Sequence, residues 1–337
     1  MEYRNRMYSA PTEPPKIKPL ENQPIFYTAD DIENLPRQEE IFIETGIKEI
    51  DKKIRGLKLG AVSVFSGLRA SAKSTLLSQV SLNAIDKNIN VCIYSGELTP
   101  RNFMKWLYLQ AAGKGYTEPT EFEGYYKTPK KYKDQIVKWL ADKLLLYNND
   151  YGNKFEAIKN EVRKVTVEKN VKLIILDNLM SFDIKSLSSD KYQAQTDFIW
   201  ELQRIAKDLN VHIAFVAHPR KAMGFLRLDD ISGTADLGNA VDYAFIVHRV
   251  NNDFRRLSKQ MFMWKDDNPI YKATNAIEIA KDRDGGTQDY FVPLWYETET
   301  KRLKNDETEN KIFSWNNEVT VEGFVPVGPY EETPFDD

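Results

Sequence analysis

The segment from Gly67 to Ser74 constrains the fold of this chain more than any other part of its sequence. It follows an apolar run at residues 61–65 that is typical of a buried strand, and it precedes a stretch with apolar residues at helical spacing. A turn in this context that begins with glycine and ends in Lys-Ser is similar to the phosphate-binding pattern G-x-x-x-x-G-K-[ST]. In such loops, backbone N–H groups and the helix N-terminus surround the phosphates of a nucleotide.

Two polar residues of this loop have predicted roles. Lys73 is expected to reach the β- and γ-phosphates of ATP or another nucleoside triphosphate, and the Ser74 hydroxyl is expected to hold Mg²⁺. Ala72 stands where the pattern has its second glycine, and alanine costs on the order of 1 kcal/mol there if the loop requires a positive φ. The residues predicted to bind the nucleotide are Gly67, Arg69, Ala70, Ser71, Ala72, Lys73, Ser74 and Thr75.

Two carboxylates follow predicted strands and suit the chemistry of a nucleotide site. Asp177 ends the apolar run at residues 173–176, where a carboxylate could organise Mg²⁺ together with Ser74. Glu97 comes shortly after the run at residues 91–94 and could orient or deprotonate a water molecule. Ligands bind at the carboxyl ends of strands in open α/β sheets, so both groups could face one site. A solvated carboxylate after a strand is the alternative for each, and spacing alone excludes it less well for Glu97.

Strand-like apolar runs alternate with longer amphipathic stretches throughout the middle of the chain. This alternation favours an α/β fold with a mainly parallel central sheet flanked by helices. The predicted strands are residues 61–65, 91–94, 173–176, 212–217, 243–247 and 276–280, and the predicted helices follow the phosphate loop and cover residues 101–112 and 198–209.

The chain divides into three predicted regions. Residues 1–40 are rich in proline and weak in apolar periodicity, so they are interpreted as an arm or linker, with a short helix near Asp30 to Leu35. Residues 41–300 form the predicted ATPase domain, with a surface insertion at 113–135. Residues 301–337 are polar, end in acidic residues, and are interpreted as a C-terminal extension with an acidic tail.

The composition excludes several kinds of site. Cys92 is the single cysteine and there are three histidines, which argues against a zinc ribbon or a disulfide framework. The formal net charge is -3, so a nucleic-acid site has to be a local basic patch or one that forms in an oligomer. No apolar stretch approaches the roughly 20 residues that span a bilayer, and no signal peptide is recognisable. These features predict a cytoplasmic protein without a membrane partner.

Four further segments resemble the DnaB-type replicative helicases, and within them the phage primase-helicase and mitochondrial Twinkle branch. The resemblance covers residues 41–297. The segments 45–51 and 56–60 resemble the lead-in to the phosphate loop that RecA-like proteins share widely. Ser95-Gly96-Glu97-Leu98 resembles the family segment that carries the catalytic base. The most specific match is residues 279–285, which resemble the family element A-K-x-R-x-G.

The resemblance implies a RecA-like P-loop NTPase and assigns catalytic roles. Glu97 would be the base, and His218 would sense the γ-phosphate and couple it to DNA. Lys281 and Arg283 would act on the nucleotide of a neighbouring subunit, where a cation can contribute 10³–10⁵ in rate. Taken without the family, that element is better described as a basic turn after an edge strand.

The resemblance also implies partners. Single-stranded DNA would pass through a ring, a hexamer or heptamer, with 5′-to-3′ movement, and primase, polymerase or a single-strand-binding protein could associate with it. The predicted DNA-binding residues are Arg220, Lys221 and Arg227, and residues 185–191 form a second candidate loop. These cations are equally consistent with a solvated loop. Residues 1–40 are too short for a primase domain. We expect a bacterial or phage-infected host cytoplasm.

Two other functions remain open at this stage. A recombinase ATPase of the RecA or RadA type shares the lead-in, the phosphate loop and the carboxylate at Asp177. A nucleotide-binding scaffold or loader that hydrolyses weakly is suggested by Ala72. The helicase interpretation rests on His218 and on the Lys281 to Arg283 element.

Overall fold

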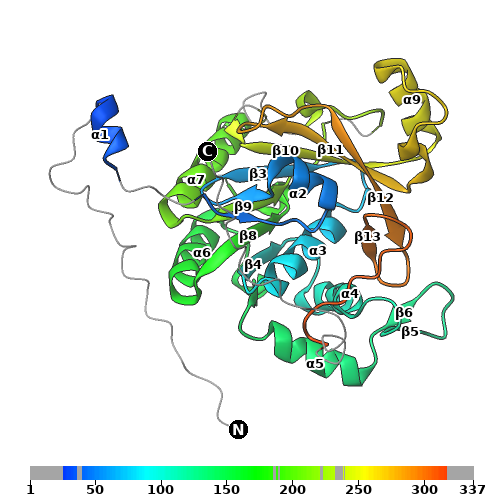
Figure 1. Ribbon diagram of the computed structural model, residues 1–337. Helices are drawn as coiled ribbons and strands as arrows, with labels where there is room; N and C mark the ends of the chain where they lie inside the picture. The colour runs from blue at the N-terminus through cyan, green and yellow to red at the C-terminus, as the bar shows by residue number, and fades with distance from the viewer. Residues whose placement is uncertain are drawn as a thin grey trace, which may run out of the picture.

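The computed structural model describes residues 26–35, 40–184, 187–188, 190–220, 223–231, 238 and 240–316. Within these residues the main strands are β3 (Val62–Ser66), β4 (Asn90–Ser95), β7 (Leu144–Leu146), β8 (Val171–Asp177), β9 (His212–Val216), β10 (Tyr243–Arg249), β11 (Asn275–Asp282), β12 (Tyr290–Glu297) and β13 (Arg302–Lys304). They form one sheet in the order β13-β12-β11-β10-β3-β9-β8-β4-β7 (Figure 1).

The sheet has a parallel body and an antiparallel flank. All neighbours from β10 to β7 are parallel, whereas β11, β12 and β13 are antiparallel to their neighbours. The parallel strands therefore end together at one edge of the sheet, which we call the carboxyl edge, and begin at the opposite one, the amino edge. The prediction of a mainly parallel sheet is confirmed. The sheet also has an antiparallel flank, in which β12 and β13 follow β11.

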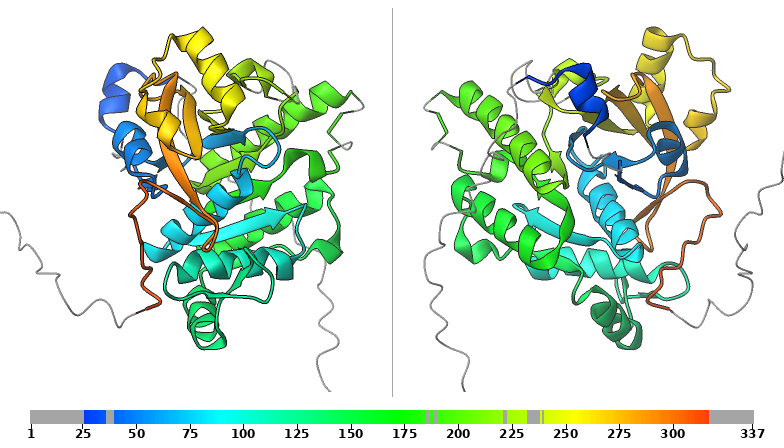
Figure 2. Two further views of the ribbon diagram at one scale, coloured as in Figure 1. Left: turned by 90° about the vertical axis from the view of Figure 1, so that its right-hand side faces the viewer. Right: turned by 60° about the vertical axis from the view of Figure 1, so that its left-hand side comes forward.

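Helices cover both faces of this sheet. The helices of the described residues are α1 (Ala29–Glu33), which buries no residue, and α2 (Lys48–Ile54), α3 (Lys73–Asp86), α4 (Pro100–Ala112), α5 (Lys130–Leu140), α6 (Phe155–Lys169), α7 (Lys191–Leu209) and α9 (Asn252–Phe262). Helices α2 to α5 bury their apolar side chains in one core, and α6 and α7 bury theirs in another. Figure 2 shows α3, in cyan, and the green helices α6 and α7 on opposite sides of the sheet.

Alternating side chains along each strand build the two cores. In β8, Leu173 and Ile175 join the core beneath α3, whereas Ile174 and Leu176 join the core beneath α6 and α7. Successive strand residues point to opposite faces, so a sheet covered on both sides needs an unbroken apolar run. That requirement explains why the apolar runs predicted these strands correctly.

Short elements complete the fold. Two small antiparallel sheets pair β1 (Phe42–Ile43) with β2 (Leu57–Lys58) and β5 (Glu118–Pro119) with β6 (Tyr126–Lys127). The second of these lies in the predicted surface insertion, whose Phe122 and Tyr125 are exposed. Single-turn helices are η1 (Asn149–Tyr151), η2 (Leu179–Ser181), η3 (Leu228–Asp230) and η4 (Pro269–Lys272).

The C-terminal boundary predicted at residue 300 divides a packed unit. Arg302 in β13 is buried and donates hydrogen bonds to the carbonyls of Gln110 (2.7 Å) and Ala111 (3.3 Å), in the last turn of α4. Trp315 is also buried and donates its indole N–H to Ala111 O at 2.8 Å. The carbonyls of a helix C-terminus need such donors, so Arg302 and Trp315 pack against the end of α4, across the predicted boundary. The predicted acidic tail lies beyond the described residues.

The N-terminal region contains a short helix close to the predicted position at Asp30 to Leu35. Helix α1 has Thr28 as its N-cap, which accepts a hydrogen bond from the Asp31 backbone, and it buries no residue. Residues 1–25 of the predicted arm lie outside the described part of the chain. None of the described helices is both long enough and apolar enough to cross a membrane.

Candidate active site

The phosphate loop joins β3 to α3 at the carboxyl edge. Gly67, its first residue, has φ 154°, and a Cβ atom there would lie 2.4 Å from the carbonyl oxygen of Val247 in β10. Only glycine can therefore begin this loop, because the backbone of the neighbouring strand is too close for a side chain. Asn275, at the start of β11, supports the loop from the side by donating its amide N–H to Ser71 O at 3.2 Å.

Ala72 occupies the position where sequence analysis noted a missing glycine. Its backbone has φ 75° and ψ 28°, in the left-handed region, and it is the N-cap residue of α3. The condition attached to that prediction is therefore met, because an L-residue other than glycine is strained in this region. Ala70 also has a positive φ, at 59°.

Lys73 lies inside the loop. Its side chain is buried, and Nζ donates hydrogen bonds to Gly67 O at 2.8 Å and Leu68 O at 3.0 Å. Burial lowers the pKa of Lys73, while the carboxylates of Asp177 and Glu97 act in the opposite direction. A desolvated lysine that is held by carbonyls is placed to exchange these contacts for phosphate oxygens.

Asp177 and Ser74 form the pair of oxygen donors that a magnesium ion needs. Asp177 ends β8 with only 8% of its surface exposed, and the Ser74 side chain hydrogen-bonds to its carboxylate. Burial raises the pKa of Asp177, and the hydrogen bond from Ser74 opposes this rise. Mg²⁺ is commonly bound by one or two carboxylates together with substrate phosphates, so these two oxygen ligands fit it.

The described residues contain no group of three or more His, Cys, Asp or Glu side chains that could enclose a metal ion. The phosphate loop does hold a buried hydroxyl, Ser71 Oγ, without a hydrogen-bond partner in the described chain. An unsatisfied buried donor is costly, and a phosphate oxygen would satisfy it. The loop therefore fits a nucleotide with a magnesium ion better than it fits a metal held by protein ligands alone.

Glu97, Asn178 and His218 meet next to the phosphate loop, although they follow three different strands. The Asn178 amide donates to Glu97 Oε1 and lies 3.1 Å from His218 Nε2, which is itself 3.3 Å from Glu97 Oε1. Register explains the meeting, because Ser95 in β4 lies opposite Asp177 in β8. Sequence analysis missed Asn178; its position directly after Asp177 was the only available signal.

Lys281 and Arg283 lie at the amino edge, away from this cluster. Strand β11 runs antiparallel to β10 and places Asp282 opposite Tyr243, which pairs in turn with Ser63 near the start of β3. Lys281 Nζ donates to Gly238 O at 2.8 Å. Arg283 forms an ion pair with Asp242 at 2.8 Å and also donates to Ala240 O. The structure does not bring these two cations to the phosphate loop of their own chain.

The predicted DNA-binding residues are placed unequally. Arg220 is exposed just after β9, and its backbone N–H donates to Asp230 O at 2.7 Å. Lys221 lies outside the described residues, as do three residues of the second candidate loop at 185–191. Arg227 turns inward and forms ion pairs with Glu278, at 3.1 Å, and with Asp289.

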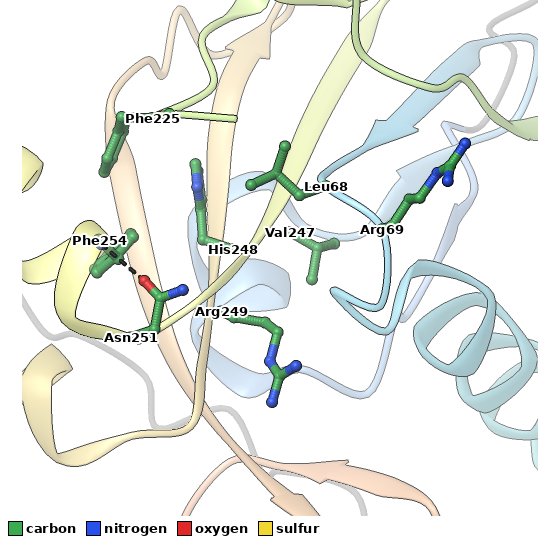
Figure 3. Close-up of a pocket in the computed structure, with 9 residues that line it drawn as sticks. Leu68, Arg69, Phe225, Val247, His248, Arg249, Asn251 and Phe254 are labelled. Atoms are coloured by element: carbon green, nitrogen blue, oxygen red, sulfur yellow. Dashed lines mark hydrogen bonds between the residues drawn. The ribbon is translucent and has the colours of Figure 1, made fainter. Parts of the chain in front are cut away.

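A cavity of about 200 Å³ lies between the phosphate loop and the end of β10 (Figure 3). Leu68 and Arg69 line it on the loop side, and His248 and Arg249 line it on the side of β10. Arg249 is a residue that sequence analysis did not select. Its signal was weak, because it is one basic residue at the end of an apolar run.

Comparison with known proteins agrees with this geometry. Residues 42–305 match the family described as DnaB-like helicase C terminal domain. The chain belongs to this family. DnaB-like helicase domains of this kind have the RecA-like P-loop fold that the sequence predicted, and the observed sheet confirms it.

Individual relatives are distant. The replicative DNA helicase DnaB of Rickettsia felis is 21% identical over 299 residues, covering 82% of this chain and 59% of that protein. A Twinkle homolog protein, chloroplastic/mitochondrial, of Arabidopsis thaliana is 22% identical over 220 residues, covering 61% of this chain and 30% of that protein. The chain therefore spans less than two thirds of the length of each of these curated relatives.

Solved structures support the fold. One described as "The Structure Of A DnaB-Like Replicative Helicase And Its Interactions With Primase" has a TM-score of 0.63 and 14% identity. It covers 78% of this chain, which covers 62% of that one. At this identity the likeness establishes the RecA-like architecture, and the chemistry rests on the residues described above.

Proposed function

We propose that this DnaB-like domain is the ATP-driven motor of a ring-forming replicative helicase that moves on single-stranded DNA. One observation carries the proposal: the side chains suited to hydrolysis, Lys73, Asp177 and Glu97, gather at the carboxyl edge, while two further cations lie at the amino edge of the same sheet. The Arg283 N–H donates to Asp242 O, and the Asp242 N–H donates to Val62 O. With about 3.3 Å per strand residue, Arg283 therefore lies about 16 Å from the level of Gly67.

That separation exceeds the reach of an arginine side chain, so Arg283 cannot serve the nucleotide of its own chain. Repetition of the chain around a closed ring would place the amino edge of one subunit against the carboxyl edge of the next. Lys281 and Arg283 would then exchange their contacts with Gly238 O and Asp242 for oxygens of the neighbour's γ-phosphate. A closed ring would thus bring the residues at the carboxyl edge of one subunit together with the cations at the amino edge of the next.

At the carboxyl edge, the residues have separate tasks in hydrolysis. The phosphate-loop N–H groups and Lys73 would hold the β- and γ-phosphates, and Ser74 with Asp177 would hold Mg²⁺, which offsets the charge that develops during phosphoryl transfer. Glu97 would accept a proton from the attacking water. Asn178 orients the Glu97 carboxylate by donating to Oε1, and His218, in contact with both, would report γ-phosphate loss to the segment that follows it.

DNA binding, ring size and location follow as finer proposals. The segment after His218 carries Arg220 and Lys221, and cations repeated around a ring would bind single-stranded DNA without a basic subunit. A hexamer, 5′-to-3′ movement and a primase partner are proposed from the family and from the relative solved with primase. A cytoplasmic location is proposed on the same basis.

A second candidate function is favoured by one observation. The left-handed backbone of Ala72 strains the loop, and a scaffold or loader that hydrolyses slowly would tolerate this. The recombinase alternative has no comparable support, because the family match is to helicases.

The deciding experiment is ATP hydrolysis with and without single-stranded DNA, using Lys73→Ala as the control for contaminating activity. Stimulation by DNA that disappears in Lys73→Ala would support the motor. Tight nucleotide binding without hydrolysis in either condition would overturn it and favour the scaffold, and a strand-unwinding assay on a forked duplex would separate helicase from recombinase.

A further inference from the structure

The segment that follows His218 is a loop closed at its base. Pro219 forms an antiparallel bridge with Ile231, and the Arg220 N–H donates to Asp230 O. Between these contacts, the described residue Met223 is 81% exposed. One end of this loop is thereby tied to the cluster of Glu97, Asn178 and His218.

The loop returns into a cluster of aromatic side chains at Phe225. The Phe225 ring stacks on the rings of His248 and Phe254, with centroid distances of 4.7 and 5.2 Å. Its centroid also lies 5.6 Å from that of Phe262 and 6.0 Å from that of Phe291. These partners come from β10, α9 and β12, so Phe225 packs against three separate elements. Figure 3 shows Phe225 beside His248 and Phe254.

Arg227 adds a buried charged contact to this anchor. Glu278 of β11 has no exposed surface, and its carboxylate lies between Arg227 NH1, 3.1 Å from Oε1, and His248 Nε2, 3.0 Å from Oε2. A carboxylate at full burial requires such partners, because removal of one leaves an uncompensated charge. The guanidinium also lies over the Phe262 ring at 5.2 Å and pairs with Asp289.

Strand β11 connects this anchor to the amino edge. Glu278 lies opposite Ile246, which pairs with Ser66 at the carboxyl edge, and Lys281 lies farther along the same strand. Strand β11 pairs with β10 from Asn275 to Asp282 and with β12 from Asn275 to Ile279. A displacement of the loop would therefore reach Lys281 and Arg283 through Arg227, Glu278 and the backbone of β11.

We propose that Arg227 is a positioning residue that joins the loop between Pro219 and Ile231 to β11, rather than a phosphate ligand. This inference rests on the proposed function and revises the sequence prediction for Arg227. Its guanidinium faces the carboxylates of Glu278 and Asp289 and the ring of Phe262. If Arg227 bound a DNA phosphate instead, the fully buried Glu278 carboxylate would lose one of its charge partners each time DNA bound.

The test compares Arg227→Met, Glu278→Gln and their combination, with Asp289→Asn as the control for the outer ion pair. Two quantities are measured on the full chain: the ratio of DNA-stimulated to basal ATP hydrolysis, and the salt dependence of binding to labelled oligo-dT. Glu278 is fully buried and acidic, so it cannot itself bind phosphate, and any effect of Glu278→Gln on DNA coupling must act through position.

If Arg227 positions the loop, both single variants lose stimulation by a similar factor, roughly 2- to 30-fold, and the double variant is no worse than either. The salt slope stays unchanged, and Asp289→Asn resembles the parent. If Arg227→Met lowers the salt slope by about 1 while Glu278→Gln retains normal stimulation, Arg227 is a phosphate ligand and the inference is wrong.

Two safeguards keep the result interpretable. If Arg227→Met is poorly folded by thermal melting, Arg227→Lys replaces it, because lysine keeps the charge but not the planar fork; partial stimulation supports positioning and normal stimulation contradicts it. If the unaltered protein hydrolyses ATP without any response to DNA, the proposed function itself fails. If the unaltered protein responds to DNA and both single variants respond equally well, only the inference about Arg227 is wrong.

Discussion

The two edges of the central sheet are built on different principles. At the carboxyl edge, the candidate site residues lie in or beside the phosphate loop. Hydrogen bonds within the same chain hold the side chains of Lys73, Asp177 and Glu97 there. At the amino edge, Arg283 remains 46% exposed at its side chain and is held by Asp242, which lies in its own chain. The first edge is organised within one chain, whereas under the proposed function the second would act on the nucleotide of a neighbouring subunit.

This difference suggests how subunit assembly could control ATP hydrolysis. A site completed within one chain would hydrolyse ATP in any assembly state, at a cost to the cell. If Lys281 and Arg283 act on a neighbouring nucleotide as proposed, their separation from the phosphate loop would make fast turnover depend on assembly. The contacts of Lys281 with Gly238 O and of Arg283 with Asp242 keep both cations satisfied until then.

The strongest test of the comparison is Arg283→Ala. Because this cation would stabilise charge on the transferred phosphoryl group, we expect turnover in the assembled protein to fall by about 10³- to 10⁵-fold. Increasing doses of the variant mixed into unaltered protein should depress turnover more than in proportion. Arg256→Ala, at an exposed arginine of α9, is the matched control. Strictly proportional loss would show that each subunit works alone.

Glu97→Gln tests the carboxyl edge by itself. The amide keeps the shape of the side chain but cannot accept a proton, so hydrolysis should fall by about 10²- to 10⁴-fold with nucleotide binding retained. Binding of a fluorescent nucleotide and single-turnover hydrolysis measure the two quantities. Equal loss of binding and hydrolysis would instead assign Glu97 a role in holding the nucleotide.

A pH titration examines the amino edge through His212, which is buried at the start of β9. Its Nδ1–H donates to Lys58 O and its Nε2 accepts from Ser63 Oγ, each at 2.8 Å. Burial lowers the pKa of His212 to about 4. The unfolded chain binds a proton near pH 6.5 and the folded chain does not, so this contribution to stability is complete above pH 6.5 and is lost as pH falls toward 4. The loss amounts to about 3 kcal/mol.

The measurement is the free energy of unfolding against pH for the unaltered protein and for His212→Asn. Subtracting the two curves removes the contribution of carboxylates such as Asp177, whose raised pKa acts in the opposite direction. A difference that stays constant between pH 6.5 and 4 would show that His212 is charged in the folded protein.

The smallest expected effect concerns Ala72→Gly at the carboxyl edge. Glycine adopts the observed φ of 75° without strain, so the free energy of unfolding should rise by about 1 kcal/mol, measured by denaturant unfolding. Ala84→Gly, within the same helix α3, is the control and should lower the free energy of unfolding. An unchanged free energy of unfolding for Ala72→Gly would show that alanine carries no strain at this position.

Much of the fold and of the carboxyl edge could be predicted because their signals are local. Buried strands require continuous apolar runs, and a phosphate loop requires a fixed sequence between a strand and a helix. Strand β13, with its arginine and lysine, carries no apolar run, so the chain from 301 to 316 was interpreted as an extension. Arg302 lies in the core only because it donates to the carbonyls at the end of α4.

Local sequence patterns were sufficient to predict the RecA-like class, to select Lys73, Ser74 and Asp177 as candidate site residues, and to identify a helicase-like element at Lys281 to Arg283. The position of this element at the edge opposite the phosphate loop, the contacts of Asn178 with Glu97 and His218, and the ion pair of Arg227 with Glu278 became visible in the folded chain. The physical reason is common to all three. Strand order and register bring together residues that are remote in the chain, and no local pattern of apolar or charged residues encodes those pairings.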